Sequence, residues 1–343
     1  MPELRKDPII GRWVIIATER AARPMDFAKE KDPVALNNNC PFCEGQEKKT
    51  PPEILAYHPP GRAKDSPDWW IRVVSNKFPA LGVEGDLDRR GDGIYDRMNG
   101  VGAHEVIIEC PDHDKKYFEL APIHAGDMLW SFRERILDLK KDPRMEYILI
   151  FKNHGKAAGA SLAHPHAQLI ALPMVPAHVK QEISGGRQYI DFKERCIFCD
   201  IVSQELSAKS RIVDENEDFL CFAPYASRFP FETWIIPKHH QSHFETTERP
   251  QIDRMASLLQ STLSRMDSVL GNPPFNYILH SAPLKEPPMA HFHWHLEIIP
   301  KLTHVAGFEW GSGFYINPMP PEQAAKYLRE ANLSSIKEPA HAN

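Results

Sequence analysis

The sequence lacks long apolar runs and an excess of positive charge, and both absences narrow its function. No apolar run approaches the roughly 20 residues that span a bilayer. The amino terminus, MPELRKDPIIGRWVII, carries charges where a signal peptide has its apolar segment. We therefore expect a soluble cytoplasmic protein with no membrane partner. The formal net charge of −5 does not favour binding to a nucleic-acid backbone.

Cysteine is also scarce, with six among 343 residues, yet four of the six form two C-x-x-C pairs. These pairs are CPFC at residues 40–43 and CIFC at residues 196–199. In a reducing cytosol this spacing indicates metal binding or redox chemistry rather than disulfides. The 17 histidines favour metal binding.

Similar features follow each C-x-x-C pair in the same order, which indicates that the chain contains two copies of one structural unit. Each half has strand-like runs, an amphipathic helical stretch, another strand-like run and a His-x-His strand. The first half has these at residues 69–81, 104–113, 125–142, 147–155 and 164–170, and the second at 218–232, 233–240, 251–270, 275–283 and 293–299. The pattern predicts an α+β fold of two histidine-triad-like units, each an antiparallel sheet backed by a helix.

This repeat predicts two domains, a catalytic one at residues 1–185 and a second at residues 186–343. The stretch SGGR at residues 184–187 is the expected junction. A chain of 343 residues is long enough for two domains or for one that has been duplicated and fused.

Each half supplies four candidate ligands for a structural zinc ion. Two cysteines and two histidines close a tetrahedral site and leave no open coordination position. The predicted ligands are Cys40, Cys43, His113 and His164 in the first half, and Cys196, Cys199, His240 and His293 in the second.

Two alternatives stay open for the second metal site. His239 neighbours His240, and spacing alone does not choose between them. A harder metal such as iron could use nitrogen and oxygen ligands, and the candidates for that set are Glu182, His280, His293 and His295. Because two cysteines are available in this half, zinc is the favoured ion.

The two His-x-His strands, HPHAQLI at residues 164–170 and HWHLEII at residues 293–299, differ in what surrounds them. A histidine nucleophile on phosphorus needs donors for the phosphate oxygens. The loop NHGKAAGAS, residues 153–161, contains Gly155 and Gly159, which allow the backbone to approach a ligand closely. Ser161 adds a hydroxyl and Gln168 an amide, both uncharged.

The corresponding loop of the second half, HSAPLKEPPMAHF, has no glycine and several prolines, so it offers fewer N–H donors. Glu297 stands at the position of Gln168, and its carboxylate would repel a phosphate. The comparison predicts that His166 is the nucleophile. It also predicts that the second copy binds metal and has a structural role.

The stretch NHGKAAGASLAHPHAQLIALP resembles the active-site region of the galactose-1-phosphate uridylyltransferases, a nucleotidyl-transferring branch of the histidine triad superfamily. The resemblance covers nearly the whole chain. It includes DPIIGRWVIIATERAARP, CPFC, PDH, His-Pro-His-x-Gln and GFEWGSGFYINPMPPEQAA. His-Pro-His-x-Gln together with an upstream cysteine pair is far more specific than a lone short motif.

The resemblance implies a ping-pong reaction with a nucleotide sugar and a hexose 1-phosphate as substrates. His166 would attack the α-phosphorus of UDP-glucose and release glucose 1-phosphate, and galactose 1-phosphate would then take the uridylyl group. By the same resemblance, Gln168 bonds the phosphoryl oxygens and Ser161 contacts the substrate phosphates. Arg20 and Arg23 match positions near the phosphates, where arginine suits bidentate binding.

The resemblance also implies that Asn76 and Asn153 line the nucleotide site. The family is usually a homodimer whose sugar pocket borrows residues from the partner subunit. The segment GFEWGSGFYINP would fall at that pocket.

The carboxy-terminal GFEWGSGFYINPMPPEQAA is more similar to a second group of the family, which includes the ADP-glucose phosphorylases. Those enzymes use the same histidine and transfer the nucleotide to inorganic phosphate, so the base and the acceptor stay open. A histidine triad hydrolase would have no use for a sugar pocket. A zinc protein that binds nucleic acid would leave the glycine-rich loop unexplained.

Overall fold

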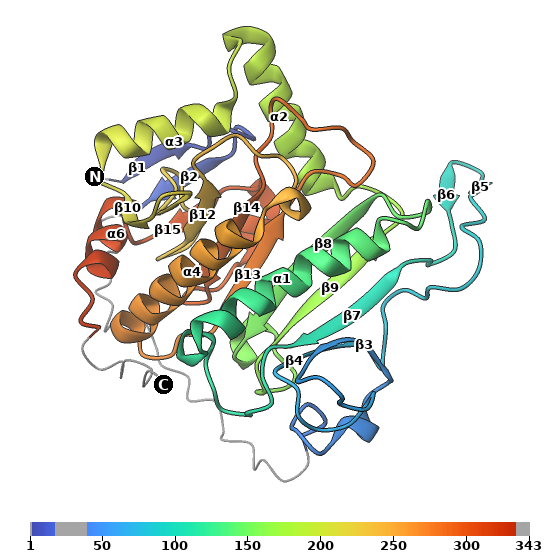
Figure 1. The fold of residues 1–343 in the computed structure, drawn as a ribbon. Helices are drawn as coiled ribbons and strands as arrows, with labels where there is room; N and C mark the ends of the chain where they lie inside the picture. The colour runs from blue at the N-terminus through green and yellow to red at the C-terminus, as the bar shows by residue number, and fades with distance from the viewer. Residues whose placement is uncertain (1, 18–39, 334–343) are drawn as a thin grey trace.

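The computed structural model describes residues 2–17 and 40–333. Its centre is one antiparallel sheet of ten strands in the order β10-β11-β12-β14-β13-β8-β9-β7-β4-β3 (Figure 1). The strands are β3 (Glu53–Tyr57), β4 (Ile71–Ser75), β7 (Ala103–Ile108), β8 (Tyr147–His154), β9 (His166–Leu172), β10 (Ile212–Glu215), β11 (Phe219–Phe222), β12 (Thr233–Pro237), β13 (Phe275–His280) and β14 (His295–Pro300).

The sheet repeats itself about its middle, where β8 pairs with β13. Outward from that pair, the first half runs β8-β9-β7-β4-β3 and the second runs β13-β14-β12-β11-β10. The registers also match. Gln168 lies opposite Val106 and Phe151, while Glu297 lies opposite Trp234 and Ile278. The predicted α+β fold of two duplicated antiparallel units is confirmed.

Two helices, α1 (Pro122–Leu139) and α4 (Arg249–Leu270), lie side by side on one face of the sheet (Figure 1). Each corresponds to a predicted helical stretch. Phe132 of α1 and Leu259 of α4 are buried in one apolar cluster with Leu169 of β9. Burying each such side chain contributes about 1.5–3 kcal/mol. Because side chains alternate along a strand, His166, Gln168 and their neighbours on alternate positions face away from these helices.

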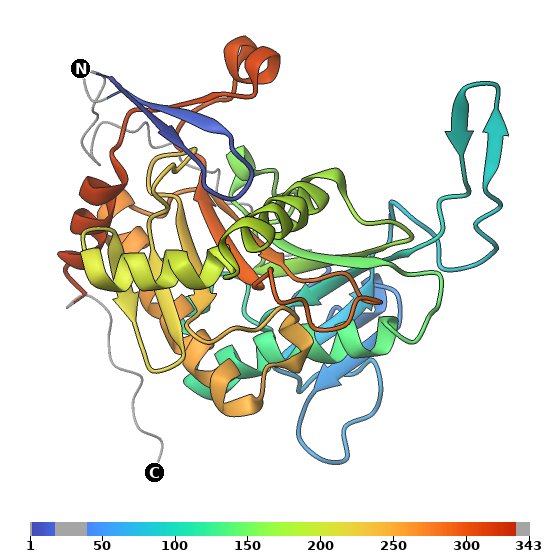
Figure 2. The ribbon, with the colours of Figure 1, turned by 90° about the horizontal axis from the view of Figure 1, so that it is seen from above.

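The opposite face of the second half is covered by helices α2 (Ala177–Lys193) and α3 (Ile197–Ala208) and by a small three-stranded sheet, as Figure 2 shows. The small sheet consists of β1 (Glu3–Lys6), β2 (Trp13–Ile16) and β15 (Tyr315–Asn317). Phe198 of α3 packs with Phe222 and Trp234 of the large sheet.

The expected junction at residues 184–187 lies inside the continuous helix α2. A Cβ atom on Gly185 would lie 1.8 Å from the carbonyl oxygen of Ile9, and one on Gly186 would lie 2.1 Å from that of His291. The two glycines therefore allow close packing of a continuous helix. A division into domains at residues 1–185 and 186–343 stays a proposal, with the β8–β13 pair as their seam.

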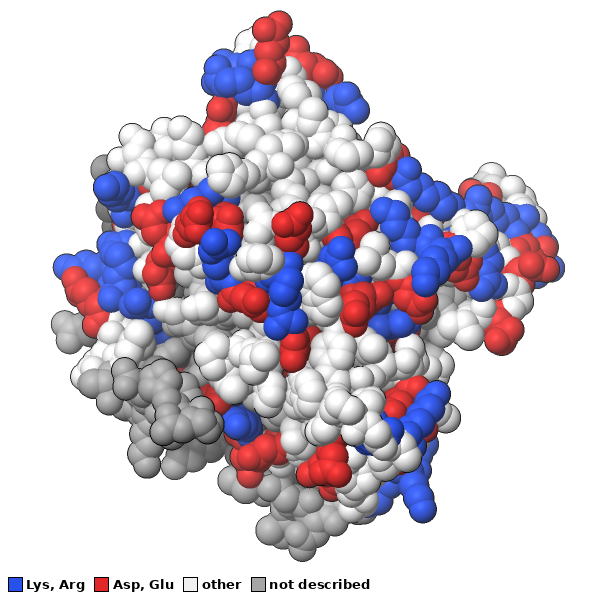
Figure 3. All heavy atoms as spheres, viewed as in Figure 1, with Lys and Arg blue, Asp and Glu red and all other residues white. Residues whose placement is uncertain are grey.

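The remaining elements are short. They are η4 (Glu47–Lys49), η5 (Tyr117–Glu119), η6 (Lys156–Ala158), η7 (Phe244–Thr246), the projecting hairpin β5 (Arg90–Asp92) and β6 (Tyr95–Arg97), α5 (Gly307–Ser312) and α6 (Pro321–Arg329). Acidic and basic side chains are interspersed on the face shown in Figure 3. Among residues 2–17 and 40–333, no helix combines the length and the apolar character that crossing a membrane requires.

Candidate active site

The first cysteine–histidine group forms where three loops meet at one end of the first half-sheet. Cys40 and Cys43 lie in the turn before η4, His113 follows β7 and His164 lies two residues before the start of β9. Their four ligand atoms lie within 4.8 Å of one another. Cys43 Sγ is 3.4 Å from His113 Nδ1 and 3.6 Å from His164 Nδ1. A tetrahedral zinc ion separates sulfur and nitrogen ligands by about 3.5 Å, so the group fits zinc.

The surroundings of this group prepare its side chains as ligands. His164 Nε2 donates to the carbonyl oxygen of Cys110 at 2.8 Å, which leaves Nδ1 unprotonated and directed at the cysteines. Burial lowers the pKa of His164 to about 4, so its ring is neutral at pH 7. Burial and the neighbouring Cys40 raise the pKa of Cys43 to about 11, so a thiolate there needs a cation beside it.

The second cysteine–histidine group occupies the equivalent place in the second half. Cys196 and Cys199 flank the start of α3, His240 follows β12 and His293 precedes β14. Cys199 Sγ is 3.5 Å from His240 Nδ1 and 3.3 Å from His293 Nε2. His240 donates through Nε2 to the carbonyl oxygen of Met289. Within the described part of the chain, His240 and not His239 completes this group, which also fits zinc.

A third buried group contains Glu182, His280, His295 and Glu297. The iron alternative expected His293 in the place of Glu297, and this expectation is wrong because His293 lies with the cysteines. His280 Nδ1 is 3.0 Å from Glu182 Oε2, and Arg228 donates to Glu297 at 2.5 Å. Burial alone would raise the pKa of Glu297, but Arg228 and His280 hold it below its usual value. The group therefore carries an internal network of ion pairs.

His166, the predicted nucleophile, begins β9 on the face away from α1 and α4. Its Nδ1 donates to the carbonyl oxygen of His164 at 2.8 Å, so the lone pair is on Nε2. Burial lowers the pKa of His166, which keeps the ring neutral and nucleophilic at pH 7. The ring of Phe42 packs against it at 5.2 Å between centroids.

Three amide side chains lie around this face of the first half, and each has its oxygen occupied by a protein group. The oxygen of Asn76 accepts from the Phe78 backbone N–H at 2.9 Å. The oxygen of Asn153 accepts from Asn276 Nδ2 at 2.7 Å. The oxygen of Gln168 lies 2.9 Å from His104 Nε2. Because each oxygen is engaged, the NH₂ group is the part of each amide that can donate to a ligand, and a set of donors suits an anion. Asn76 Nδ2 also lies 3.1 Å from His104 Nε2.

Asn276 comes from β13 of the second half, and its second N–H donates to the carbonyl oxygen of Ala158 at 2.8 Å. Ala158 belongs to the glycine-rich loop, so Asn276 ties that loop to the sheet and orients Asn153. The spacing of motifs in the first half carries no signal for this contact. His104 stands at the start of the run HEVIIECPDH, where its strand position would have placed it on the face of Gln168.

The glycine-rich loop turns at Gly155 and Gly159, which have φ angles of 79° and 89°. L-residues rarely adopt these angles, so glycine is required there. The position of a Cβ on Gly159 is 3.7 Å from Asn153 Nδ2, which places the predicted Gly159 beside the amides. Ser161 is exposed in the same loop.

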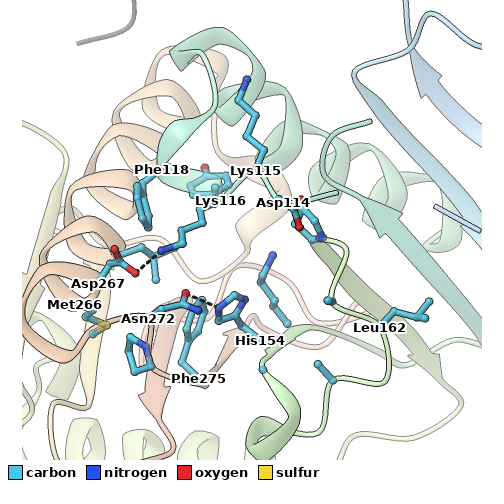
Figure 4. Close-up of a pocket in the computed structure, with 18 of the residues that line it drawn as sticks. Asp114, Lys115, Lys116, Phe118, His154, Leu162, Met266, Asp267, Asn272 and Phe275 are labelled. Atoms are coloured by element: carbon cyan, nitrogen blue, oxygen red, sulfur yellow. Dashed lines mark hydrogen bonds and ion pairs between the residues drawn. The ribbon is translucent and has the colours of Figure 1, made fainter. Parts of the chain in front are cut away.

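A cavity of about 550 Å³ lies on the other side of this loop, toward the helices (Figure 4). Lys116 pairs with Asp267 at its rim at 2.6 Å, and His154 contacts Asn272 at 3.2 Å. His154 alternates with Asn153 along β8 and so points to the opposite face of the sheet. Ser161 lines the cavity, whereas His166 and Gln168 do not. The loop thus separates the cavity from the amides.

The structure brings His166, Gln168, Asn153 and Asn76 to one face of the first half, next to the first cysteine–histidine group. Arg20 and Arg23, predicted near the phosphates, lie outside the described residues. The role of each of these side chains in substrate binding stays a prediction.

Comparison with known proteins agrees with this geometry. The model described as "Galactose-1-phosphate uridyl transferase, N-terminal domain" matches residues 1–176, and one described as "Domain of unknown function (DUF4921)" matches residues 131–340. An ADP-glucose phosphorylase from Arabidopsis thaliana is 39% identical, over 97% of this chain and 94% of that protein. A galactose-1-phosphate uridylyltransferase from Thermotoga maritima is 29% identical, over 97% and 99%.

A solved structure has a closely similar fold. The crystal structure of an ADP-glucose phosphorylase from Arabidopsis thaliana with bound ADP-glucose superposes with a TM-score of 0.82 and 37% identity. The match covers 97% of this chain and 100% of that chain. The resemblance found in the sequence is confirmed.

Proposed function

The chain belongs to the galactose-1-phosphate uridylyltransferase family, and on this premise we propose that it transfers a nucleotidyl group from a nucleotide sugar through a covalent bond to His166. The observation that carries the proposal is that His166, with its lone pair on Nε2, lies on the same face of the sheet as three amides whose oxygens are engaged by protein N–H groups. A nucleophile and a set of uncharged donors are what substitution at a phosphorus centre requires.

In the first half-reaction, His166 Nε2 attacks the α-phosphorus of the nucleotide sugar. The bond from phosphorus to the bridging oxygen breaks, and glucose 1-phosphate leaves with that oxygen and its electron pair. The ring keeps its proton on Nδ1 and gains positive charge, which the carbonyl oxygen of His164 stabilises at 2.8 Å. Gln168 and Asn153 donate to the non-bridging oxygens as negative charge builds on them.

In the second half-reaction, an oxygen of the acceptor attacks the same phosphorus, the N–P bond breaks and neutral His166 is restored. With inorganic phosphate as the acceptor, ADP-glucose becomes ADP and glucose 1-phosphate. With galactose 1-phosphate as the acceptor, UDP-glucose becomes UDP-galactose and glucose 1-phosphate.

Of these two reactions, phosphorolysis of ADP-glucose has the support of the higher identity, 39% to the Arabidopsis phosphorylase against 29% to the Thermotoga uridylyltransferase. Uridylyl transfer to galactose 1-phosphate, the reaction that the sequence motifs favoured, is the second candidate. Both use His166 in the same way, so they differ only in the base and the acceptor.

Zinc at the cysteine–histidine groups would be structural, because four protein ligands leave no open position for substrate. In the first group, His164 is the ligand whose carbonyl oxygen holds the ring of His166. His164, when held by the metal, would thereby orient His166. The proposal also includes a homodimer in a cytoplasmic setting, as the family resemblance implies.

The test is intact-mass spectrometry of the metal-replete protein mixed separately with ADP-glucose and UDP-glucose, with no acceptor present. An adenylyl adduct that maps to His166 supports the phosphorylase, and a uridylyl adduct supports the uridylyltransferase. The isolated adduct is then challenged with phosphate or with galactose 1-phosphate to identify the acceptor. No adduct with either nucleotide sugar would overturn the covalent mechanism.

A further inference from the structure

His104 lies on β7, on the same face of the sheet as Gln168 of the neighbouring strand β9. The Ala80 backbone N–H donates to His104 Nδ1 at 3.1 Å. A backbone N–H can only donate, so Nδ1 carries a lone pair and the proton of the neutral ring is on Nε2. The protein backbone thus fixes the tautomer of this histidine.

The protonated Nε2 of His104 lies 2.9 Å from Gln168 Oε1 and donates to it. An amide whose oxygen is held in this way presents its NH₂ group on the other side. Asn76 Nδ2 is 3.1 Å from the same Nε2, but a nitrogen that bears a proton accepts no hydrogen bond there. The N–H groups of Asn76 and of Gln168 are therefore both left for a ligand.

We propose that His104 is a positioning residue that holds the Gln168 amide with its NH₂ group toward the phosphoryl oxygens. This inference rests on the proposed nucleotidyl transfer. Without the donor from His104, the Gln168 amide can rotate and present its oxygen to the phosphate. That oxygen would repel the charge that the NH₂ group stabilises.

The second half of the chain supports the assignment from its own geometry. Because Gln168 and Glu297 occupy equivalent register positions, the counterpart of His104 is Glu232. Arg228 bonds Glu232 at 2.7 Å and Glu297 at 2.5 Å. In both halves, therefore, the residue at this position is linked to the side chain two positions after the His-x-His pair: His104 contacts Gln168 directly in the first half, and Glu232 shares Arg228 with Glu297 in the second.

The test compares His104→Asn with His104→Gln. These variants separate the contact of Nδ1 with the Ala80 N–H from the contact of Nε2 with Gln168. The oxygen of an asparagine can take the place of Nδ1 and accept from Ala80, but asparagine is too short to reach Gln168. The amide nitrogen of a glutamine can take the place of Nε2 and restore the donor. The measurement is the single-turnover rate of nucleotidyl adduct formation on the metal-replete full chain, together with the dissociation constant of the nucleotide sugar.

We expect His104→Asn to slow adduct formation by about tenfold, the effect of one oriented hydrogen bond, and His104→Gln to restore most of the rate. On a Gln168→Ala background, His104→Asn should slow the reaction no further, because its effect passes through Gln168. Melting temperatures of all variants identify any general loss of structure.

Two results would overturn the role of His104. One is an equal loss of rate in His104→Asn and His104→Gln, and the other is a loss that adds in full to that of Gln168→Ala. Failure of the proposed function would look different, because the unchanged protein would form no adduct at all.

Discussion

The two His-x-His strands, β9 and β14, have the same backbone pairing and opposite chemical surroundings. In the first half, His166 shares a face of the sheet with uncharged amides whose oxygens are engaged by protein N–H groups. In the second half, His295 is fully buried between the rings of Trp234 and His280, at 4.6 and 4.9 Å.

Charge separates the two copies further. Glu182, Glu297 and Glu232 all lie in the buried network of the second half, where Arg228 and His280 offset them. Carboxylates would oppose the entry of a phosphate. The comparison supports the proposal that the histidine pair alone is a structural element and that side chains on the neighbouring strands make one copy reactive.

The largest expected effect comes from removing each histidine in turn. His166→Gly should slow adduct formation by at least about 10⁴-fold, because the nucleophile is lost. His295→Gly should retain adduct formation and lower the melting temperature, because a buried ring is removed from between Trp234 and His280. Time-resolved intact-mass spectrometry reads the first effect and calorimetry the second. The reverse pattern would show that the second copy is the catalyst.

The next largest effect on adduct formation is expected from replacing Gln168 by glutamate, the residue that stands at the equivalent position 297 of the second copy. Gln168→Glu should slow adduct formation by about 10²–10³-fold, since it removes a donor and adds a negative charge beside the phosphate. Gln168→Met removes the donor without adding charge, and it should be less impaired. If the two variants had equal rates, charge at this position would not explain the difference between the copies.

A smaller effect is expected from the metal ligands. Cys43→Ser and Cys199→Ser should each lower the zinc content of the chain, as measured by mass spectrometry of the metal. Cys43→Ser should also slow adduct formation by about 10–100-fold, because the metal anchors His164 and so the ring of His166. Cys199→Ser should mainly lower the melting temperature. Equal losses of rate would contradict the division between a catalytic and an architectural copy.

The smallest effect tests the contact between the halves. Asn276→Asp replaces a double donor by a carboxylate that faces the oxygens of Asn153 and Ala158, so the Asn153 amide should turn. We expect adduct formation to slow by about tenfold. The matched control is Asn272→Asp, on the cavity side of the loop, where the oxygen that contacts His154 is kept. A loss of rate in the control would mean that the loop responds to charge in general.

The sequence was sufficient to predict the order of elements and the members of both cysteine–histidine groups, because those depend on local spacing and on alternation along strands. That His164 is a metal ligand and His166 the nucleophile stays a prediction. In the structure, His164 and His293 precede their strands, whereas His166 and His295 begin them. The iron alternative included His293, which the structure groups with Cys196, Cys199 and His240 instead.

Other features depend on contacts between distant segments and could not be predicted. The stretch SGGR was expected as the junction of the two halves, and its glycines lie within a helix that packs against the backbones of residues 9 and 291. Asn276 is separated from Asn153 by 123 positions, and only the seam between β8 and β13 brings them together. The role of His104 depends on a backbone N–H from the loop after β4.

That seam also indicates how such an enzyme could arise from a simpler ancestor. A single unit would end in an open strand edge at β8, and two identical copies could pair there about a twofold axis. In such a symmetric pair, any substitution appears in both copies, so an asparagine at position 276 would also stand at the register-equivalent position, Leu149. Joining the copies in one gene lifts that constraint, because each position can then mutate independently. One copy can then acquire residues, such as Asn276, that position side chains of the other.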